Sequence, residues 1–234
     1  MRDRPDSFLG ALQLADSFFP SGAYALSYGL EAAIEDGRVS DAAGLAAWLH
    51  AVIVGQVGPI DGVVVGAAWE ASAVGAIDQL RSLDHWVEAG RLTREGRRAS
   101  RRMGRRLLET GRRLLAERAP PSLDLYRAAV LRGEAPGHQP VAFGVVSAAM
   151  GLDRASAIAV ALYSAATSIL GAGLRLLRVD HETSQAILFR LQPVLAKTTR
   201  RCLDQPWPET WSACPEVEVC AMRHERATRH LFAT

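Results

Sequence analysis

The residues whose types and spacing could hold a metal ion are histidines and cysteines in the last third of the chain. Cys220 and His224 stand four positions apart, so on a helix they would share one face and could supply half of a metal site. His181 lies between Asp180 and Glu182 and could meet an ion that prefers nitrogen and oxygen ligands, such as nickel. A reduced cysteine, a hydrogen-bonded histidine and an exposed loop are simpler explanations, because two ligands do not complete a site. We therefore predict no bound metal and no cofactor, and keep Cys220, His224 and His181 as candidate ligands.

Motifs of the common enzyme classes are incomplete in this sequence. A P-loop needs a lysine within a glycine-rich run, and the single lysine, Lys197, follows Ala196 instead. The two His-Glu pairs, which begin at positions 181 and 224, lack the second histidine that a zinc-protease motif places four residues after the first. No G-x-S-x-G nucleophile turn occurs. The sequence therefore predicts a protein that is not an enzyme.

The strongest charge feature is the segment 91–118, which contains eleven arginines and three glutamates. The segment carries a charge of +8, so the rest of the chain must be acidic, because the whole chain has a net charge of +2. Three interpretations stay open: a solvated helix face, a surface on which Arg98, Arg101 and Arg105 pair with the carboxylates of a protein partner, and a nucleic-acid-binding surface. The last is the least favoured, because the segment has no aromatic residue for base stacking.

The elements that must position these residues are helices. Apolar residues make up 49% of the chain and aromatic residues only 6%, which favours helices with small contact residues over a sheet. We predict an all-α fold in which residues 1–234 form a single globular helical-bundle domain of about ten helices, with a less regular C-terminal tail from about 204. The three cysteines are an odd number and indicate a cytoplasmic protein without disulfides.

Caps, prolines and apolar periodicity give approximate helix positions. The expected helices are 24–36, one capped by Ser40, one that starts at Pro59, 93–118, one capped by Ser122, 141–150, 153–177, 185–200 with a kink or break at Pro193, and a short one near 217–226. Glycines at 58, 62 and 66 predict close helix–helix approach. The uncharged stretch 155–174 is as long as a membrane span but rich in small residues, so we predict a central buried helix and no membrane partner.

One stretch, Phe19 to Glu31 (FPSGAYALSYGLE), resembles the signature of the UreF family of urease accessory proteins. Its matching positions are Pro20, Gly22, Ser27, Gly29, Leu30 and Glu31, with Tyr24 in place of a phenylalanine. Three more segments are similar to family motifs and follow in the expected order: 93–108, His138 to Gly144 (HQPVAFG) and Met222 to Glu225 (MRHE). The stretch Arg178 to His181 departs from the usual family turn.

The resemblance implies an all-α accessory protein that dimerises, binds the accessory protein UreD and recruits the GTPase UreG to load nickel into apo-urease. It implies that the C-terminal tail contacts UreD and that the helical body serves dimerisation and GTPase docking. The tail charges could instead only cap or tether the tail. A helical nucleic-acid-binding protein that uses the segment 91–118 is the alternative function. The expected partner-binding residues are Pro20, Gly22, Tyr24, Ser27, Glu31, Arg98, Arg101, Arg105, Arg223, His224 and Glu225.

Overall fold

The computed structural model describes residues 7–20 and 26–224, and within these ranges it contains helices and no β-strand. The all-α fold is therefore confirmed. The first half contains α1 (Ser7–Ala15), α2 (Leu30–Glu35), α3 (Ala42–Val52), the π-helix η2 (Ile53–Gly62), α4 (Val63–Ala73), α5 (Ile77–Gly90) and α6 (Arg94–Leu115). The second half contains η3 (Ala116–Arg118), α7 (Pro121–Leu131), α8 (Gln139–Ala149), α9 (Arg154–Leu176), α10 (His181–Asp204), η4 (Trp207–Glu209) and α11 (Pro215–His224).

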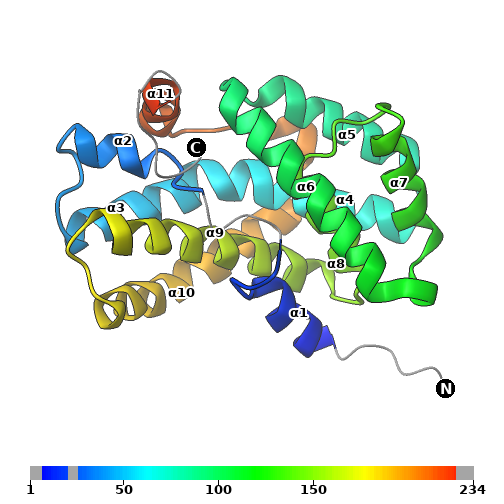
Figure 1. Cartoon of the computed structure of the whole chain (residues 1–234), viewed down its shortest axis with the longest axis horizontal. Helices are drawn as coiled ribbons and strands as arrows, with labels where there is room; N and C mark the ends of the chain where they lie inside the picture. The colour runs from blue at the N-terminus through cyan, green and yellow to red at the C-terminus, as the bar shows by residue number, and fades with distance from the viewer. Residues whose placement is uncertain (1–6, 21–25, 225–234) are drawn as a thin grey trace.

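The core is built around α4 and α8, whose side chains are buried on nearly all sides. Small residues let these helices approach closely. A Cβ at Gly144 of α8 would lie 2.5 Å from the carbonyl oxygen of Val65 on α4. On the other side of α8, a Cβ at Gly104 of α6 would collide with the backbone of Gly137 and His138. The helices α4, α6 and α8 therefore pack backbone against backbone (Figure 1).

The helices α3, η2 and α4 form one continuous helical segment from Ala42 to Ala73. The prediction that a new helix starts at Pro59 is wrong, because the wider π-helical turns accommodate this proline inside the helix. The predicted close approach at the glycines of this segment is confirmed. A Cβ at Gly58 would collide with Thr198 of α10, and one at Gly62 would lie 2.9 Å from the sulfur of Cys202.

The central buried helix is confirmed as α9, whose N-terminus is capped by Asp153. The Asp153 carboxylate accepts the Ser156 N–H at 2.8 Å. The segments Ala42–Ala73 and Arg154–Leu176 are both long and apolar enough to cross a membrane, but 61% of the most apolar window of each is buried. Such burial is typical of core helices.

Several predicted helix ends shift in the structure. The first predicted helix, 24–36, is shorter in the described residues: Tyr28 and Gly29 have φ angles of 50° and 75°, so α2 begins only at Leu30. Asp41, and not Ser40, caps α3 by accepting the Gly44 N–H at 2.8 Å.

Four further elements differ from the sequence prediction. Ser122 lies inside α7, where its hydroxyl contacts that of Ser72 at 3.1 Å, and is not a cap. The helix α10 continues through Pro193 without ending. The helices α1 and α5 have no counterpart among the predicted helices.

Candidate functional site

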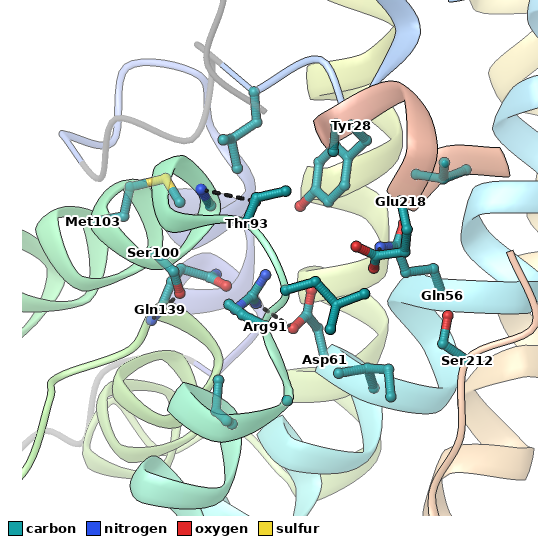
Figure 2. A pocket seen from close by; sticks show the side chains of 18 of the residues that line it. Tyr28, Gln56, Asp61, Arg91, Thr93, Ser100, Met103, Gln139, Ser212 and Glu218 are labelled. Carbon is teal, nitrogen blue, oxygen red and sulfur yellow. Dashed lines mark hydrogen bonds and ion pairs between the residues drawn. The ribbon is translucent and has the colours of Figure 1, made fainter. Parts of the chain in front are cut away.

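A cavity of about 120 Å³, lined by apolar side chains and by several polar ones, lies beneath α11, where η2, the start of α6 and α11 meet (Figure 2). Arg91 donates a hydrogen bond to Asp61 at 2.6 Å, and Gln56 donates one to Glu218 of α11 at 2.6 Å. Burial raises the pKa of the Tyr28 hydroxyl and of the Glu218 carboxyl. The cavity has room for several water molecules. The Gln56–Glu218 hydrogen bond fastens α11 to η2, and the Arg91–Asp61 pair fastens the segment before α6 to the same helix.

The segment between α10 and α11 is held by carbonyl groups of η2. Pro59 has no N–H to donate, and the carbonyl of Gly55, four residues earlier, accepts the N–H of Ala213 at 2.8 Å. The carbonyl of Pro59 itself accepts the hydroxyl of Thr210. Glycine is needed at position 55, because a Cβ there would collide with the sulfur of Cys214. The proline-containing π-helix thus supplies the anchor points that carry the chain to α11.

The helix α11 lies on α2 (Figure 1). Gly29 is left-handed with φ of 75°, and a Cβ there would lie 3.1 Å from both the Cys220 Cβ and the Val217 carbonyl. At the end of α11, Arg223 Nη1 lies 2.5 Å from Asp36 Oδ2. The signature residues around Gly29 therefore form the surface on which the C-terminal helix α11 packs.

A second polar network lies inside the body, between α5, α7 and the entry to α8. Asp84 is fully buried and accepts three hydrogen bonds: from the Tyr126 hydroxyl at 2.9 Å, the Gly137 N–H at 2.6 Å and the His138 N–H at 2.9 Å. Burial raises the pKa of the Asp84 carboxyl. Since its partners come from α7 and from the loop before α8, this carboxylate fixes the loop on which the predicted motif HQPVAFG begins.

His138 is buried at the N-terminus of α8 and links this network to the arginine helix. Its Nε2 lies 2.7 Å from Glu88 Oε2, and Glu88 also lies 3.7 Å from Arg97 and 3.5 Å from Arg101. Burial and the nearby arginines, Arg91 and Arg101 foremost, lower the pKa of His138 to about 3. The Glu88 carboxylate would favour a charged imidazole, but its charge is shared with two guanidinium groups. His138 is therefore neutral and donates from Nε2.

The arginines of α6 fall into two groups. On one side, Arg97 and Arg101 face Glu88, and Arg112 donates to Asp124 of α7 at 2.6 Å. The other group is exposed to solvent and makes neither an ion pair nor a side-chain hydrogen bond with the described residues; it consists of Arg98, Arg102, Arg106 and Arg113. The first group anchors the helix, and the second presents charge to solvent.

The predicted partner-binding residues do not gather in one place. Pro20 is exposed, whereas Ser27 and Glu31 are buried and can act only by shaping the turn before α2. Arg98 is exposed, Arg101 faces Glu88, and Arg105 donates to the Pro136 carbonyl at 3.4 Å. The structure does not describe three of the predicted residues, Gly22, Tyr24 and Glu225, or the side chain of His224.

The candidate metal ligands are spread over the structure. Cys220 is buried against α2, and His181 is exposed at the start of α10. Within residues 7–20 and 26–224, no group of three or more His, Cys, Asp and Glu side chains is arranged to hold a metal ion. The described residues therefore do not bring Cys220 and His181 together as metal ligands.

Sequence reasoning missed Asp84, Glu88 and Tyr126, because an acidic residue in a helix usually indicates a solvent-facing position. The signal that could have found the network was His138. It is the N-cap residue of α8, yet its side chain does not cap the helix and so has another partner.

Comparisons with known proteins agree with the motifs along the chain. The sequence profile of the UreF family matches residues 39–192. The "Urease accessory protein UreF" of Paenarthrobacter aurescens (strain TC1) is 33% identical over 224 residues, which cover 96% of each chain. The protein of the same description from Arthrobacter sp. (strain FB24) is 34% identical over 225 residues, again 96% of each chain. That from Trichodesmium erythraeum (strain IMS101) is 28% identical over 225 residues and 96% of each chain.

Proposed function

The chain belongs to the UreF family of urease accessory proteins, and from this premise we propose that it is a non-enzymatic scaffold for urease maturation. In this proposal it dimerises in the cytoplasm, binds a UreD-type protein and recruits a UreG-type GTPase, so that the complex loads nickel into apo-urease. The observation that carries the proposal is similarity to urease accessory proteins over 96% of the chain.

The packing of α11 on the body supports a role for this C-terminal helix in binding the UreD-type protein. One side of α11 is fixed to the body through buried Val217 and Cys220, while Val219 and Met222 on the other side are 43% and 41% exposed. A helix that is held on one side and apolar on the other presents a pre-ordered surface, which lowers the entropy cost of binding a partner. Arg223 both tethers the helix to Asp36 and is 56% exposed, so it can serve both functions weighed for the tail.

Exposed apolar residues on α1 support protein–protein contacts at a second surface. Phe8, Leu9 and Leu12 are 67%, 60% and 53% exposed and lie on one face of a nine-residue helix. A cluster of large apolar side chains in water is typical of an interaction site. We assign this surface to the proposed dimer.

The nucleic-acid alternative is weakened by the ion pairs of the arginine helix. Arg97, Arg101 and Arg112 already contact carboxylates of this chain, which leaves fewer cations to neutralise phosphates. A short DNA duplex should accordingly bind weakly and lose its remaining affinity between 50 and 200 mM salt.

The experiment that tests the proposal is co-expression with the UreD-type and UreG-type proteins of the same organism, followed by affinity purification at moderate salt. We expect all three chains to co-purify, and nickel-dependent activation of apo-urease to require this chain. A stable chain that captures neither partner, or one that turns over a substrate by itself, would refute the scaffold.

A further inference from the structure

A groove of about 560 Å³ runs between α6 and α7 on the surface of the molecule. Its floor contains the apolar side chains of Leu108, Val130 and Leu131, the last of which is 66% exposed. Arg106 and Arg113 lie on the side formed by α6. The groove combines apolar lining residues with arginines, a combination that suits a ligand that is both apolar and acidic.

The row of arginines continues beyond the groove along α6. At about 100° per residue, Arg98, Arg102, Arg106 and Arg113 fall within an arc of about 80°. With a rise of about 1.5 Å per residue, the row is about 22 Å long. Its arginines form no ion pair within the described residues, whereas Arg97 and Arg101 on the adjoining arc are held by Glu88. The row is therefore free to pair with a ligand at little cost in broken contacts.

One carboxylate already shows how an acidic ligand would be held here. Glu109 lies in the groove and accepts two hydrogen bonds from Arg127 of α7, at 2.8 Å and 3.1 Å. Such bidentate pairing is the strongest geometry for a guanidinium and a carboxylate. Arg106 and Arg113, one turn before and one turn after Glu109, offer the same planar donors to carboxylates from outside.

We infer that the α6–α7 groove, together with the row Arg98, Arg102, Arg106 and Arg113, binds an acidic amphipathic helix of another protein. A row of carboxylates on that helix pairs with the arginines, and its apolar side chains cover Leu131 and the groove floor. This inference rests on the proposed scaffold function and names the chemistry of one docked segment.

The groove fits a protein helix better than two other ligands. None of the described residues that line the groove is aromatic, so the groove offers nucleic-acid bases no side chain on which to stack. A second copy of this chain is also a poorer match. Exposed carboxylates without an ion pair in the described residues, such as Glu35, Glu182 and Asp204, sit on separate helix ends and form no row of similar length.

The first test measures binding of a synthetic 16-residue helical peptide that carries a row of Glu beside a row of Leu. Fluorescence anisotropy at 50 mM salt compares the wild-type chain with Arg106→Gln/Arg113→Gln and with the matched control Arg190→Gln/Arg200→Gln, which removes two exposed arginines of α10. We expect the groove variant to bind about tenfold more weakly and the control to be unchanged. At 300 mM salt the difference should shrink. Leu131→Gln should weaken binding about tenfold at both salt concentrations.

Three outcomes of this test would overturn the inference. The first is equal binding of the same peptide with Lys in place of Glu, and the second is equal loss in the control variant. The third is a DNA duplex that binds the groove more tightly than the acidic peptide. All three variants change exposed side chains, and circular dichroism verifies that each remains folded.

The second test places the same variants in the complex with the UreD-type and UreG-type proteins. We expect Arg106→Gln/Arg113→Gln to lose one of the two partners while the other stays bound. If the wild-type chain forms the complex and the groove variant forms it equally well, the groove inference fails while the scaffold function stands. If the wild-type chain forms no complex, the scaffold function itself fails. If the variant turns a dimer into a monomer by light scattering, the ligand is a second copy and the inference is wrong.

Discussion

Removing a single hydroxyl from the core should test whether Asp84 organises the entry to α8. Tyr126 is fully buried, and its hydroxyl donates to Asp84 at 2.9 Å. The substitution Tyr126→Phe keeps the ring and deletes only this donor. Asp84 then retains the N–H groups of Gly137 and His138 as its two remaining donors.

The expected cost follows from the charge of the acceptor. A hydrogen bond to a buried charged group contributes about 1.5–3 kcal/mol, compared with about 1 kcal/mol between neutral groups. The two backbone donors continue to solvate the carboxylate, so a value of about 2 kcal/mol is expected. For a chain of this length, a loss of about 2 kcal/mol lowers Tm by about 4–8 °C.

Urea unfolding followed by circular dichroism gives the free energy of unfolding for Tyr126→Phe and for the control Tyr163→Phe. The control removes the same atom from a side chain that is 37% exposed and should change stability by less than about 0.5 kcal/mol. Equal effects of the two substitutions, or a cost below about 0.5 kcal/mol for Tyr126→Phe, would show that Asp84 does not depend on this hydroxyl.

Three further predictions concern packing, pH and the tail. Gly144→Ala should lower the free energy of unfolding by about 2 kcal/mol or more in urea titrations, because its Cβ would lie 2.5 Å from the Val65 carbonyl oxygen. The control Gly90→Ala should leave the free energy of unfolding unchanged or raise it, because nothing lies within 4 Å of the new Cβ. Because the pKa of His138 is lowered to about 3 in the folded chain, the unfolded chain takes up a proton below its ordinary pKa of about 6.5 while the folded chain does not. Stability should therefore fall as pH drops from about 6.5 toward 3 and stay constant above, and His138→Gln should flatten this slope in urea midpoints measured from pH 4.5 to 7. Arg223→Ala should lower the free energy of unfolding by less than about 1 kcal/mol, because its ion pair is exposed, and should weaken pull-down of the UreD-type protein. A larger loss of thermal stability with unchanged pull-down would show that the residue only tethers the tail.

The periodicity of α6 was the most informative pattern in the sequence. It predicted a helix over 93–118, which the structure contains as α6 and η3, and the face opposite the arginines includes Ala99 and Met103, which are both buried. It failed for Leu114, which has the right angular position but is 50% exposed in the last turn of the helix. Periodicity gives the direction of a side chain and cannot tell whether a neighbour is present on that side.

The missed elements have a different cause. The helix α5 carries Asp84 and Glu88 toward the interior, so its inner face does not read as purely apolar. Their partners are about 40 to 54 residues away in sequence at Tyr126 and His138, and no local pattern joins them. The turn before α2 was missed for a local reason: positive φ at Tyr28 is uncommon for a residue with a side chain.

Two helix starts were ambiguous in the sequence, because the local residue types allowed more than one interpretation. Ser40 and Asp41 are both good caps by residue type, and in the structure Asp41 is the one that caps α3. Pro59 suits a first helical turn by propensity, yet the π-helix tolerates it because nearby carbonyls find donors in the segment before α11. At Pro59, contacts from distant residues therefore accompany the choice between local alternatives.

The two-sided arrangement of α6 has an evolutionary consequence. Arginines that face Glu88 and Asp124 are tied to the architecture, so replacing them would disturb the scaffold in every relative that shares it. The arginines that point outward have no such structural role, so they can be substituted when the charges on a binding protein change. Sequence change in related organisms should therefore concentrate on Arg98, Arg102, Arg106 and Arg113, each exchange matched by a reciprocal one on the interacting chain. Covariation between the two genes would then map the contact without any further structure.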